Sequence, residues 1–298
     1  MSSILIIGQH GQVSTYLQRA FSSEHNLDCE IVVAGRDQID LSIPQNIKPA
    51  LAAIKPSLII NPAAYTAVDL AEQESELAFL INAAAVKQIA EYCVDANTPL
   101  IHFSTDYVFS GDASRPYTEQ DPAAPNGVYG QSKLDGERAI TESGAPAIIL
   151  RTSWVYSNHG KNFYKTMLML AQSRDELSVV ADQIGAPTYA GSIAQVCKAL
   201  AMTVLQRGEI TSEQRGIYHF SCQGETSWCE FAKAIFNENG LKHMTVNGIS
   251  TQQYPTPAKR PAYSVLSGAR LQSTFDLSLP KWQDALANCV AETQSSNV

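Results

Sequence analysis

The sequence predicts an α/β protein with a Rossmann-type, doubly wound parallel sheet and a smaller, discontinuous C-terminal lobe. In the first half of the chain, short apolar runs rich in β-branched residues alternate with longer amphipathic stretches. The short runs are apolar at nearly every position, which is typical of parallel strands that helices cover on both faces. The first run leads directly into a glycine-containing turn and then a helical pattern.

The expected elements follow in order along the chain. Strands are expected at residues 4–7, 30–34, 58–60, 99–103 and 147–150. Helices are expected at residues 16–21, 78–92, 163–172, 191–205 and 227–237. Past about residue 156 the alternation weakens and proline-punctuated loops intervene. We expect this part to lie over the carboxyl ends of the strands, where open α/β sheets bind ligands.

Composition and charge exclude several classes of function. The chain has 298 residues, and its 21 Lys and Arg against 29 Asp and Glu give a formal charge of −8. A nucleic-acid or anionic-membrane partner needs a basic face, so neither is expected. No apolar run is expected to reach the ~20 residues of a membrane helix, and no secretory signal is visible at the N-terminus.

The cysteines and histidines show no metal-binding spacing. The six cysteines are scattered without a CxxC pair, and no two of the six histidines form an HxxxH or HExxH pair. Scattered cysteines of this kind are typical of a protein in a reducing compartment. We therefore expect a cytoplasmic protein without a metal site.

The first glycine turn indicates a dinucleotide site. Gly8 and Gly11 lie between the first strand and the first helix, in a G-x-x-G-x-x-S pattern. Glycines there let the backbone turn tightly and approach a pyrophosphate at the helix N-terminus. Ser14 stands where a third glycine is usual, and because serine is small we expect only a slight displacement of the helix.

The end of the second strand indicates which dinucleotide is bound. Arg36 follows this strand, where an acidic residue would bind the ribose hydroxyls of NAD. An arginine there pairs with the 2′-phosphate of NADP, so NADPH is the expected cofactor and NADH the alternative. A solvated loop arginine is the other interpretation of Arg36. Asp40 and Leu41 are expected near the adenine, and the small residues within 61–65 leave room for a ribose.

A tyrosine and a lysine four residues apart indicate the chemistry. Tyr129 and Lys133 fall on one face of a helix, downstream of a fourth strand that ends near Thr105. A lysine ammonium beside a phenol stabilises the phenolate and lowers the phenol pKa toward neutrality. Tyrosine then exchanges a proton with a carbonyl or an alcohol, which is the role we expect for Tyr129.

These motifs resemble those of the extended short-chain dehydrogenase/reductases and, within them, the dTDP-4-dehydrorhamnose reductases. The resemblance covers nearly the whole chain, and several long matches in order are more specific than any single motif. They are residues 61–72 (NPAAYTAVDLAE), 104–109 (STDYVF), 151–156 (RTSWVY) and 182–188 (DQIGAPT), with Arg260, Pro261 and Ser264 near the end.

The resemblance implies an NADPH-dependent reduction. The C4 ketone of dTDP-6-deoxy-L-lyxo-4-hexulose would receive a hydride from NADPH, giving dTDP-L-rhamnose. By the family pattern, Tyr129 would protonate the C4 alkoxide, Lys133 would hold the nicotinamide ribose, and Thr105 would hydrogen-bond the ketone oxygen. These three are the expected catalytic residues.

Two sets of binding residues result, in part from the motifs and in part from the resemblance. The expected cofactor contacts are Gly8, Gly11, Gln12, Val13, Arg36, Asp40, Leu41, Ala63, Ala64, Tyr65, Tyr129 and Lys133. The expected substrate contacts are Thr105, Asp106, Trp154 and Arg260, with Arg260 toward the substrate diphosphate. Without the resemblance, Trp154 is also interpretable as a core or surface-patch aromatic residue.

The resemblance also bears on domain organisation and assembly. Residues 1–155 would form the NADP(H)-binding Rossmann domain, with returns near residues 188–222 and 262–280, and the substrate-binding lobe would comprise residues 156–187, 223–261 and 281–298. Some family members are dimers joined by a magnesium ion between glutamates on the first helix and just after the GAPT segment. The corresponding stretches here, residues 14–17 and 189–192, lack a carboxylate. We therefore predict a monomer or a homodimer not bridged by metal.

Two other activities of the same fold do not fit the sequence. A 4,6-dehydratase needs a Thr-Asp-Glu pattern, whereas Tyr107 follows Asp106 here, and an epimerase retains NAD, which Arg36 disfavours. Two alternatives stay open. One is a reductase of a related nucleotide-linked 4-keto sugar, and the other is a non-catalytic NADP-binding subunit like the regulatory β subunit of methionine adenosyltransferase.

Overall fold

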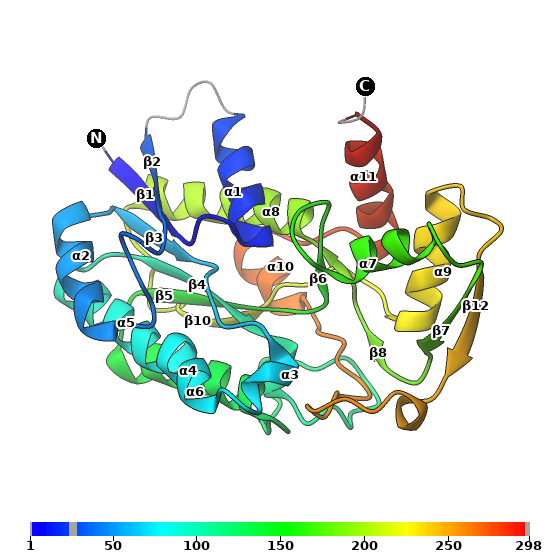
Figure 1. Cartoon of the computed structure of the whole chain (residues 1–298). Helices are drawn as coiled ribbons and strands as arrows, with labels where there is room; N and C mark the ends of the chain where they lie inside the picture. Colours follow the sequence, from blue (N-terminus) through cyan, green and yellow to red (C-terminus); the bar gives the residue numbers. More distant parts are fainter. Residues whose placement is uncertain (1, 24–28, 296–298) are drawn as a thin grey trace.

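Six parallel strands form the central sheet of the structure, a computed structural model that describes residues 2–23 and 29–295 (Figure 1). The strand order is β2–β1–β3–β4–β5–β10, and every neighbouring pair is parallel. The bounds are β1 Ser2–Ile7, β2 Cys29–Ala34, β3 Leu58–Asn61, β4 Leu100–Thr105, β5 Ala147–Thr152 and β10 Gly216–His219. The predicted fold class and its five expected strands are confirmed, whereas β10 was not expected.

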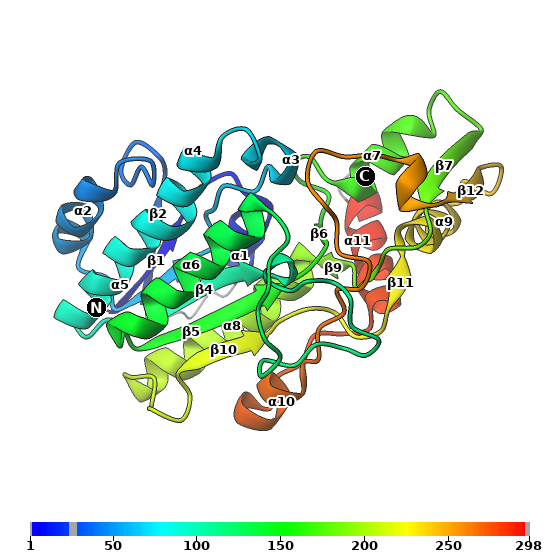
Figure 2. The same ribbon diagram turned by 90° about the horizontal axis from the view of Figure 1, so that it is seen from below.

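Helices cover both faces of this sheet, as the continuous apolar runs predict. Along β1, Ile4 and Ile6 belong to the core on one face, and Leu5 and Ile7 to the core on the other. Figures 1 and 2 show α1 (Gln12–Ser22) and α8 (Ala190–Arg207) on the first face. The second face is covered by α2 (Ile47–Ile54), α5 (Ala85–Asp95) and α6 (Val128–Ser143).

One helical run on the second face is long and apolar enough, by length and composition alone, to cross a membrane. It spans Ser75–Asp95 with a mean hydropathy of 1.3, and so corrects the expectation that no apolar run reaches this length. The run consists of α4 (Ser75–Phe79), a π-helical turn (Leu80–Ala84) and α5. Its apolar side is needed to cover the sheet, because Ala85, Val86 and Ile89 are buried in the core on that face.

A smaller group of elements adjoins the sheet, shown on the right in Figure 1. Three short strand pairs bring distant segments together: β7 (Glu176–Val180) with β12 (Thr245–Ile249), β8 (Ile184–Gly185) with β11 (Thr226–Ser227), and β6 (Val155–Tyr156) with β9 (Thr188–Tyr189). The helices of this group are α7 (Phe163–Leu170), α9 (Trp228–Glu238) and α11 (Trp282–Ser295). The helices expected at residues 163–172, 191–205 and 227–237 correspond to α7, α8 and α9. The remaining elements are η1 (Pro44–Asn46), α3 (Val68–Ala71), η3 (Asp106–Val108), η4 (Thr251–Gln253) and α10 (Ala269–Phe275).

The smaller group and the sheet share one core. Tyr164 and Phe231 of the smaller group lie in the same apolar cluster as Ile101 and Leu150 of the sheet. The assignment of this group to substrate binding stays a prediction, and residues 296–298 of the predicted lobe lie outside the described residues.

The strand order also positions a ligand crevice. The chain passes from β1 to β2 on one side and then to β3 on the other side of β1. In open α/β sheets, ligands bind outside the carboxyl ends of the strands at such a reversal point. The glycine turn after β1 therefore lies where a ligand is expected.

Candidate active site

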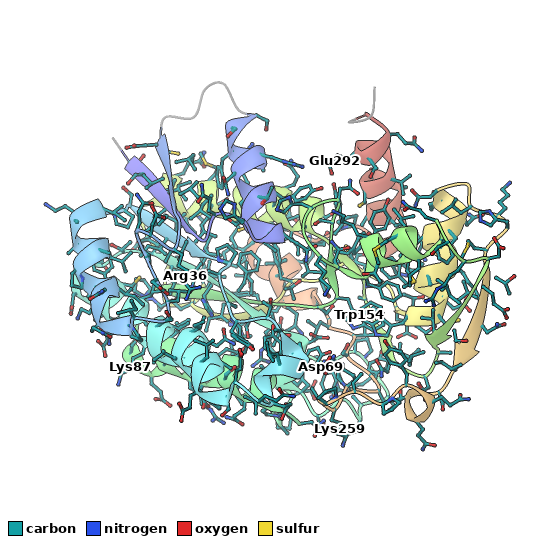
Figure 3. All side chains as sticks on the ribbon, in the orientation of Figure 1. Arg36, Asp69, Lys87, Trp154, Lys259 and Glu292 are labelled. Carbon is teal, nitrogen blue, oxygen red and sulfur yellow. The ribbon has the colours of Figure 1, made fainter. Side chains whose placement is uncertain are left out.

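A cavity of about 660 Å³ lies at this reversal point. Its wall comes from the turn after β1, the loops after β2, β3 and β5, the end of β4, and α6. Figure 3 shows Arg36 on the sheet side of the molecule and Trp154 toward the smaller group of elements. The predicted site residues that line the cavity are Gly8, Gly11, Gln12, Val13, Arg36, Asp40, Leu41, Ala63, Ala64, Thr105, Asp106, Tyr129, Lys133 and Trp154.

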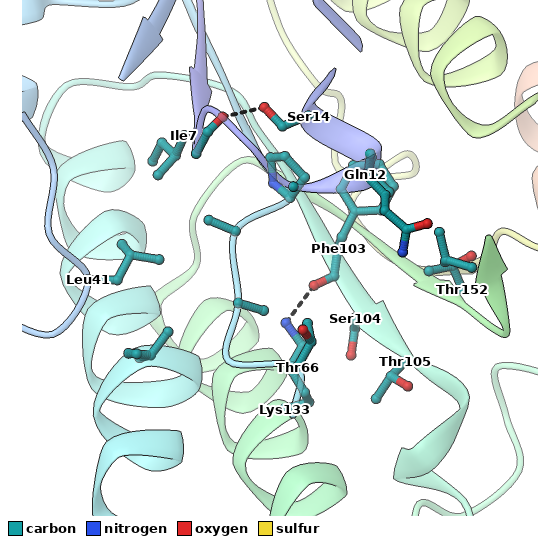
Figure 4. Close-up of a pocket in the computed structure, with 18 of the residues that line it drawn as sticks. Ile7, Gln12, Ser14, Leu41, Thr66, Phe103, Ser104, Thr105, Lys133 and Thr152 are labelled. Atoms are coloured by element: carbon teal, nitrogen blue, oxygen red, sulfur yellow. Dashed lines mark hydrogen bonds between the residues drawn. The ribbon is translucent and has the colours of Figure 1, made fainter. Parts of the chain in front are cut away.

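The glycine turn forms one wall of the cavity. Gly8 has a φ of 98°, a left-handed conformation that favours glycine, and a Cβ atom added there would lie 3.1 Å from the Cβ atom of Ala63. Gly11 caps the N-terminus of α1, and a Cβ atom there would meet open space. The Ser14 hydroxyl donates to the Gly8 carbonyl oxygen, as Figure 4 shows. Serine in place of the third glycine therefore fastens the first turn of α1 to the glycine turn.

Arg36 lies at the mouth of the cavity. Its side chain is 77% exposed, and Nε donates to a carboxylate oxygen of Asp40 at 3.1 Å. Burial acts to raise the pKa of Asp40, but hydrogen bonds from Ser42 and Arg36 outweigh it and the pKa is lowered. Asp40 therefore stays ionised and holds Arg36 beside the cavity, with most of the guanidinium open to solvent.

Tyr129 and Thr105 meet on the opposite wall. Tyr129 lies in the first turn of α6, and Thr105 is the last residue of β4. Burial raises the pKa of Tyr129, and a hydrogen bond with Thr105 only partly opposes this. The expectation that Lys133 lowers the pKa of Tyr129 is wrong, because burial raises this pKa. The phenol is protonated at neutral pH.

Lys133 explains this difference. Its side chain is 2% exposed, and Nζ donates to the carbonyl oxygen of Phe103 at 2.7 Å (Figure 4). Nζ also lies 3.4 Å from Nε2 of His102. The ammonium is thus directed to β4, and burial lowers the pKa of Lys133 to about 8, against the opposing charge of Glu137.

Asp106 adds a buried carboxyl group next to Thr105. Its Oδ1 accepts a hydrogen bond from the Thr105 hydroxyl at 3.0 Å. Burial raises the pKa of Asp106 to about 6, while hydrogen bonds from Ser264 and Thr105 act to lower it. A fraction of this residue is therefore protonated near neutral pH.

Trp154 closes the cavity on the side of the smaller group of elements. It adopts a φ of 46°, a left-handed conformation that is strained for a tryptophan. Its indole stacks on that of Trp228, and it also lies against Gly185. A Cβ atom on Gly185 would come within 2.4 Å of the Trp154 ring, so only glycine permits this contact. The geometry fixes the ring as part of the cavity wall.

Two predicted residues lie outside the cavity lining. The Tyr65 hydroxyl donates to Glu74 at 2.8 Å, which turns the ring away from the cavity. Arg260 is paired with Asp69, with Nη2 and Oδ2 2.6 Å apart. Arg260 is not among the lining residues, but its Nη1 lies 3.4 Å from the hydroxyl of Tyr107, which does line the cavity. Direct contacts of Tyr65 and Arg260 with ligands stay predictions.

Comparison with known proteins relates this cavity to a family. A family model described as the RmlD substrate binding domain matches residues 1–295. The dTDP-4-dehydrorhamnose reductase of Sinorhizobium fredii is 41% identical over 96% of both chains, and that of Escherichia coli strain K12 is 43% identical over 94% of both chains. The chain belongs to the dTDP-4-dehydrorhamnose reductase family.

Solved structures agree with this membership in the dTDP-4-dehydrorhamnose reductase family. The reductase from Clostridium acetobutylicum superposes with a TM-score of 0.89 at 34% identity, covering 98% of this chain and 99% of that one. The reductase from Bacillus anthracis, solved in complex with NADP, has a TM-score of 0.86 at 36% identity, covering 98% of this chain and 100% of that one. The resemblance seen in the sequence is confirmed.

The structure also adds residues that the sequence motifs of the dTDP-4-dehydrorhamnose reductase family did not indicate. A loop after β6 folds over the glycine turn, and the carbonyl oxygen of the Gln12 side chain accepts hydrogen bonds from Ser157 and Asn162, both at 2.8 Å. This loop brings Lys161 and Asn162 to the cavity wall. The other additions to the wall include Thr66, Val68, Ile81, Thr152, Ser153 and Val155. No spacing in the sequence connected residues near 160 with the glycine turn.

Residues 14–17 and 189–192, the two stretches without a carboxylate, both contact α11. Tyr16 on α1 and Tyr189 beside α8 both donate their hydroxyl groups to the carboxylate of Glu292 on α11. Within residues 2–23 and 29–295, no group of three His, Cys, Asp or Glu side chains could hold a metal ion. The oligomeric state stays a prediction.

Proposed function

We propose that this protein is an NADPH-dependent dTDP-4-dehydrorhamnose reductase, which reduces the C4 ketone of dTDP-6-deoxy-L-lyxo-4-hexulose to dTDP-L-rhamnose. One observation carries the proposal. A single cavity brings the glycine turn together with Thr105, Tyr129 and Lys133. Two reductases of that name, 41% and 43% identical to this chain over nearly its full length, support the same function.

The cavity residues fit a dinucleotide phosphate. The open space above Gly11 lies at the N-terminus of α1, where unpaired backbone N–H groups favour a pyrophosphate. Ile39 and Leu41 give a buried apolar surface for an adenine, and the exposed guanidinium of Arg36 suits a 2′-phosphate. The bound NADPH supplies the hydride. The Bacillus anthracis reductase was solved with NADP, which supports the same cofactor for this chain.

Tyr129 is the proton donor in this proposal. Because burial raises its pKa, the phenol keeps its proton at neutral pH, which is the form that reduction of a ketone requires. The O–H bond of Tyr129 breaks as the proton passes to the C4 oxygen. Thr105 lines the same cavity and lies close enough to Tyr129 to lower its pKa, so a carbonyl oxygen that accepts from Tyr129 also lies near the Thr105 hydroxyl. Thr105 therefore orients the ketone.

Lys133 is held ready on the cavity wall. The Phe103 carbonyl oxygen accepts one of its hydrogens, which fixes Nζ and leaves the others for a ribose hydroxyl. When it carries a charge, it stabilises the phenolate that forms on Tyr129. On the sugar side, Asp106 and the flat ring of Trp154 are the proposed substrate contacts.

The remaining predictions belong to the same proposal. We place the protein in the cytoplasm, as a monomer or a homodimer without a bridging metal, with no nucleic-acid or membrane partner. The formal charge of −8 supports the absence of an anionic macromolecular partner. The division into a cofactor domain and a discontinuous substrate lobe is supported by the cavity, since its lining includes Lys161 and Asn162 of the predicted lobe beside residues of the predicted cofactor domain.

A turnover assay over a panel of sugar nucleotides tests the proposal. The protein is incubated with NADPH or NADH and with dTDP-, UDP- or GDP-linked 4-keto-6-deoxy sugars, and the product stereochemistry is determined by NMR. We expect turnover of dTDP-6-deoxy-L-lyxo-4-hexulose with NADPH and a product of L-rhamno configuration. A preference for a UDP or GDP sugar would overturn the substrate, and tight NADPH binding without any turnover would favour the non-catalytic subunit.

A further inference from the structure

A buried chain of hydrogen bonds runs behind Lys133. Asn61 is the last residue of β3 and His102 lies in β4, and both side chains are 0% exposed. Asn61 Nδ2 lies 3.1 Å from His102 Nδ1, and His102 Nε2 lies 3.4 Å from Lys133 Nζ. Neither Asn61 nor His102 is among the described residues that line the cavity. The chain therefore contacts Lys133 from the side of the sheet.

Asn61 determines which nitrogen of His102 carries the hydrogen. The side-chain oxygen of Asn61 accepts a hydrogen bond from the backbone N–H of Ala63 at 3.2 Å, so its amide NH₂ group faces His102 Nδ1. Nδ1 must then accept, and a neutral imidazole with a bare Nδ1 carries its hydrogen on Nε2. Burial keeps this ring neutral, because it lowers the pKa of His102 well below the ordinary value.

The Nε2–H group of His102 points to Lys133. An ammonium group has three donors and no acceptor, so a charged Lys133 would set two donors against each other. An amine has a lone pair that accepts the Nε2–H hydrogen, while Lys133 still donates to the Phe103 carbonyl oxygen. The arrangement therefore stabilises the amine relative to the ammonium.

Other titratable groups near Lys133 act in known directions. The carboxylate of Glu137, one turn further along α6, raises the pKa of Lys133, but it is paired with Arg151 of β5 at 2.6 Å. Burial acts more strongly in the opposite direction. Tyr129 and Asp106 border the cavity and are neutral or partly protonated near pH 7, since burial raises the pKa of each.

We propose that His102, held in its Nε2–H tautomer by Asn61, is a positioning residue that presents a hydrogen-bond donor to Lys133 and favours its amine form. The inference rests on the proposed function. A charged Lys133 stabilises the phenolate left on Tyr129 when the ketone is protonated, and the amine does not. His102 therefore lowers the pH at which reduction declines on the alkaline side.

The tautomer is measurable without turnover. Two-bond ¹H–¹⁵N correlation spectra of the ¹⁵N-labelled protein near pH 7 distinguish the two neutral forms of each histidine. His219 is the internal control, because its Nδ1 lies 3.0 Å from the Tyr117 carbonyl oxygen and must carry the hydrogen. We expect His102 in the Nε2–H form and His219 in the Nδ1–H form. A His102 in the Nδ1–H form, or doubly protonated, would overturn the inference.

The variant Asn61→Asp tests the effect on Lys133. A carboxylate at this position only accepts, so His102 must turn to the Nδ1–H form, and its bare Nε2 then accepts from the ammonium. We expect the alkaline limb of the pH profile of kcat/KM to move up by about one pH unit or more, the size of shift that a changed charge or hydrogen-bond partner produces. An unchanged tautomer or an unmoved limb would contradict the proposal.

A double variant separates the hydrogen bond from the added charge. Asn61→Asp with His102→Leu carries the same carboxylate but has no imidazole to switch. We expect the limb to move less in the double variant than in Asn61→Asp alone, and an equal shift would show that charge alone is responsible. If the protein has the expected tautomers but reduces no sugar nucleotide, the placement of His102 stands and the proposed function fails.

Discussion

The indole rings of Trp154 and Trp228 stack with their centroids 3.5 Å apart and their planes 6° from parallel. Trp154 lines the cavity, whereas Trp228 begins α9 and packs against Phe163 at 4.6 Å between ring centroids. The stack joins the cavity wall to α9 of the smaller group of elements. It also accounts for the strained backbone of Trp154, because the stacking partner and the neighbouring Gly185 leave one position for the ring.

Removing the stacking partner is expected to weaken substrate binding. In Trp228→Leu, Trp154 loses an aromatic contact that contributes about 1 kcal/mol, so the KM for the sugar nucleotide is expected to rise about five-fold. The value of kcat and the Kd for NADPH are expected to change little, since the reacting groups are untouched. Steady-state kinetics and calorimetric titration measure these three quantities. An unchanged KM would show that the position of Trp154 does not depend on Trp228.

Adding a single methyl group at Gly185 is expected to displace the same ring. The new Cβ atom would come within 2.4 Å of Trp154, so either the ring or the β8 backbone must move. We expect a lower Tm for Gly185→Ala, by an amount corresponding to about 1–3 kcal/mol, and a raised KM. Gly268→Ala is the matched control, because a Cβ atom there meets nothing within 4 Å. Equal Tm values for the two variants would contradict the proposed contact.

A buried ion pair is expected to hold α6 in place. Glu137 pairs with Arg151 through two hydrogen bonds of 2.6 and 2.9 Å, with both side chains nearly inaccessible. Glu137→Gln leaves the Arg151 charge unpaired, which is expected to lower the free energy of unfolding by about 3–5 kcal/mol. The exposed pair Asp135–Arg138 serves as control, and Asp135→Asn is expected to cost less than about 1 kcal/mol. Denaturant unfolding of both variants checks the difference.

Arg36 is expected to select the phosphorylated cofactor. Arg36→Ala removes the exposed guanidinium at the cavity mouth and is expected to raise the Kd for NADPH about ten-fold or more, the effect of one charge-assisted hydrogen bond. The Kd for NADH is expected to stay the same, because NADH has no 2′-phosphate. Fluorescence titration with the two cofactors measures both values. Equal losses for NADPH and NADH would favour the interpretation of Arg36 as a solvated loop residue.

The buried carboxyl group of Asp106 is expected to make stability depend on pH. Burial raises its pKa in the folded protein to about 6, above the value near 3.8 of a solvated aspartate. The folded state then binds more protons than the unfolded state between these values, so the contribution of Asp106 to stability falls as the pH rises from about 4 to 6. As the pH rises from about 4 to 6, the free energy of unfolding of Asp106→Asn is expected to increase by about 2–3 kcal/mol relative to that of the wild type. Above pH 6 the difference is expected to stay constant. A pH-independent difference between the two proteins would refute this.

The sheet was predictable from the sequence because its strands are continuous apolar runs buried on both faces. The strand β10 was not, since it has four residues, starts at a glycine, and gains its place only by pairing with β5 far away in the sequence. The same limit applies to the helical run Ser75–Asp95, whose apolar length reflects the sheet face that it covers.

The candidate site was predictable where the motif itself fixes the geometry. The glycine turn and the Tyr129–Lys133 spacing place their residues on the cavity wall, because a turn and a helix determine these positions locally. Arg260 depends on Asp69, a partner 191 residues away, and the direction of Lys133 depends on a carbonyl oxygen in β4. Partners supplied by tertiary packing leave no trace in local spacing, so these contacts required the structure.

In the proposed reaction, Tyr129 donates the proton and NADPH supplies the hydride. The most direct measurement compares wild type with Tyr129→Phe for NADPH oxidation in the presence of dTDP-6-deoxy-L-lyxo-4-hexulose, with NADPH binding measured on both proteins. We predict steady turnover by the wild type, a loss of about 10²–10⁴-fold in kcat for the variant, and similar NADPH affinity. Wild-type protein that binds NADPH but oxidises none, or a Tyr129→Phe variant with undiminished turnover, would contradict the account.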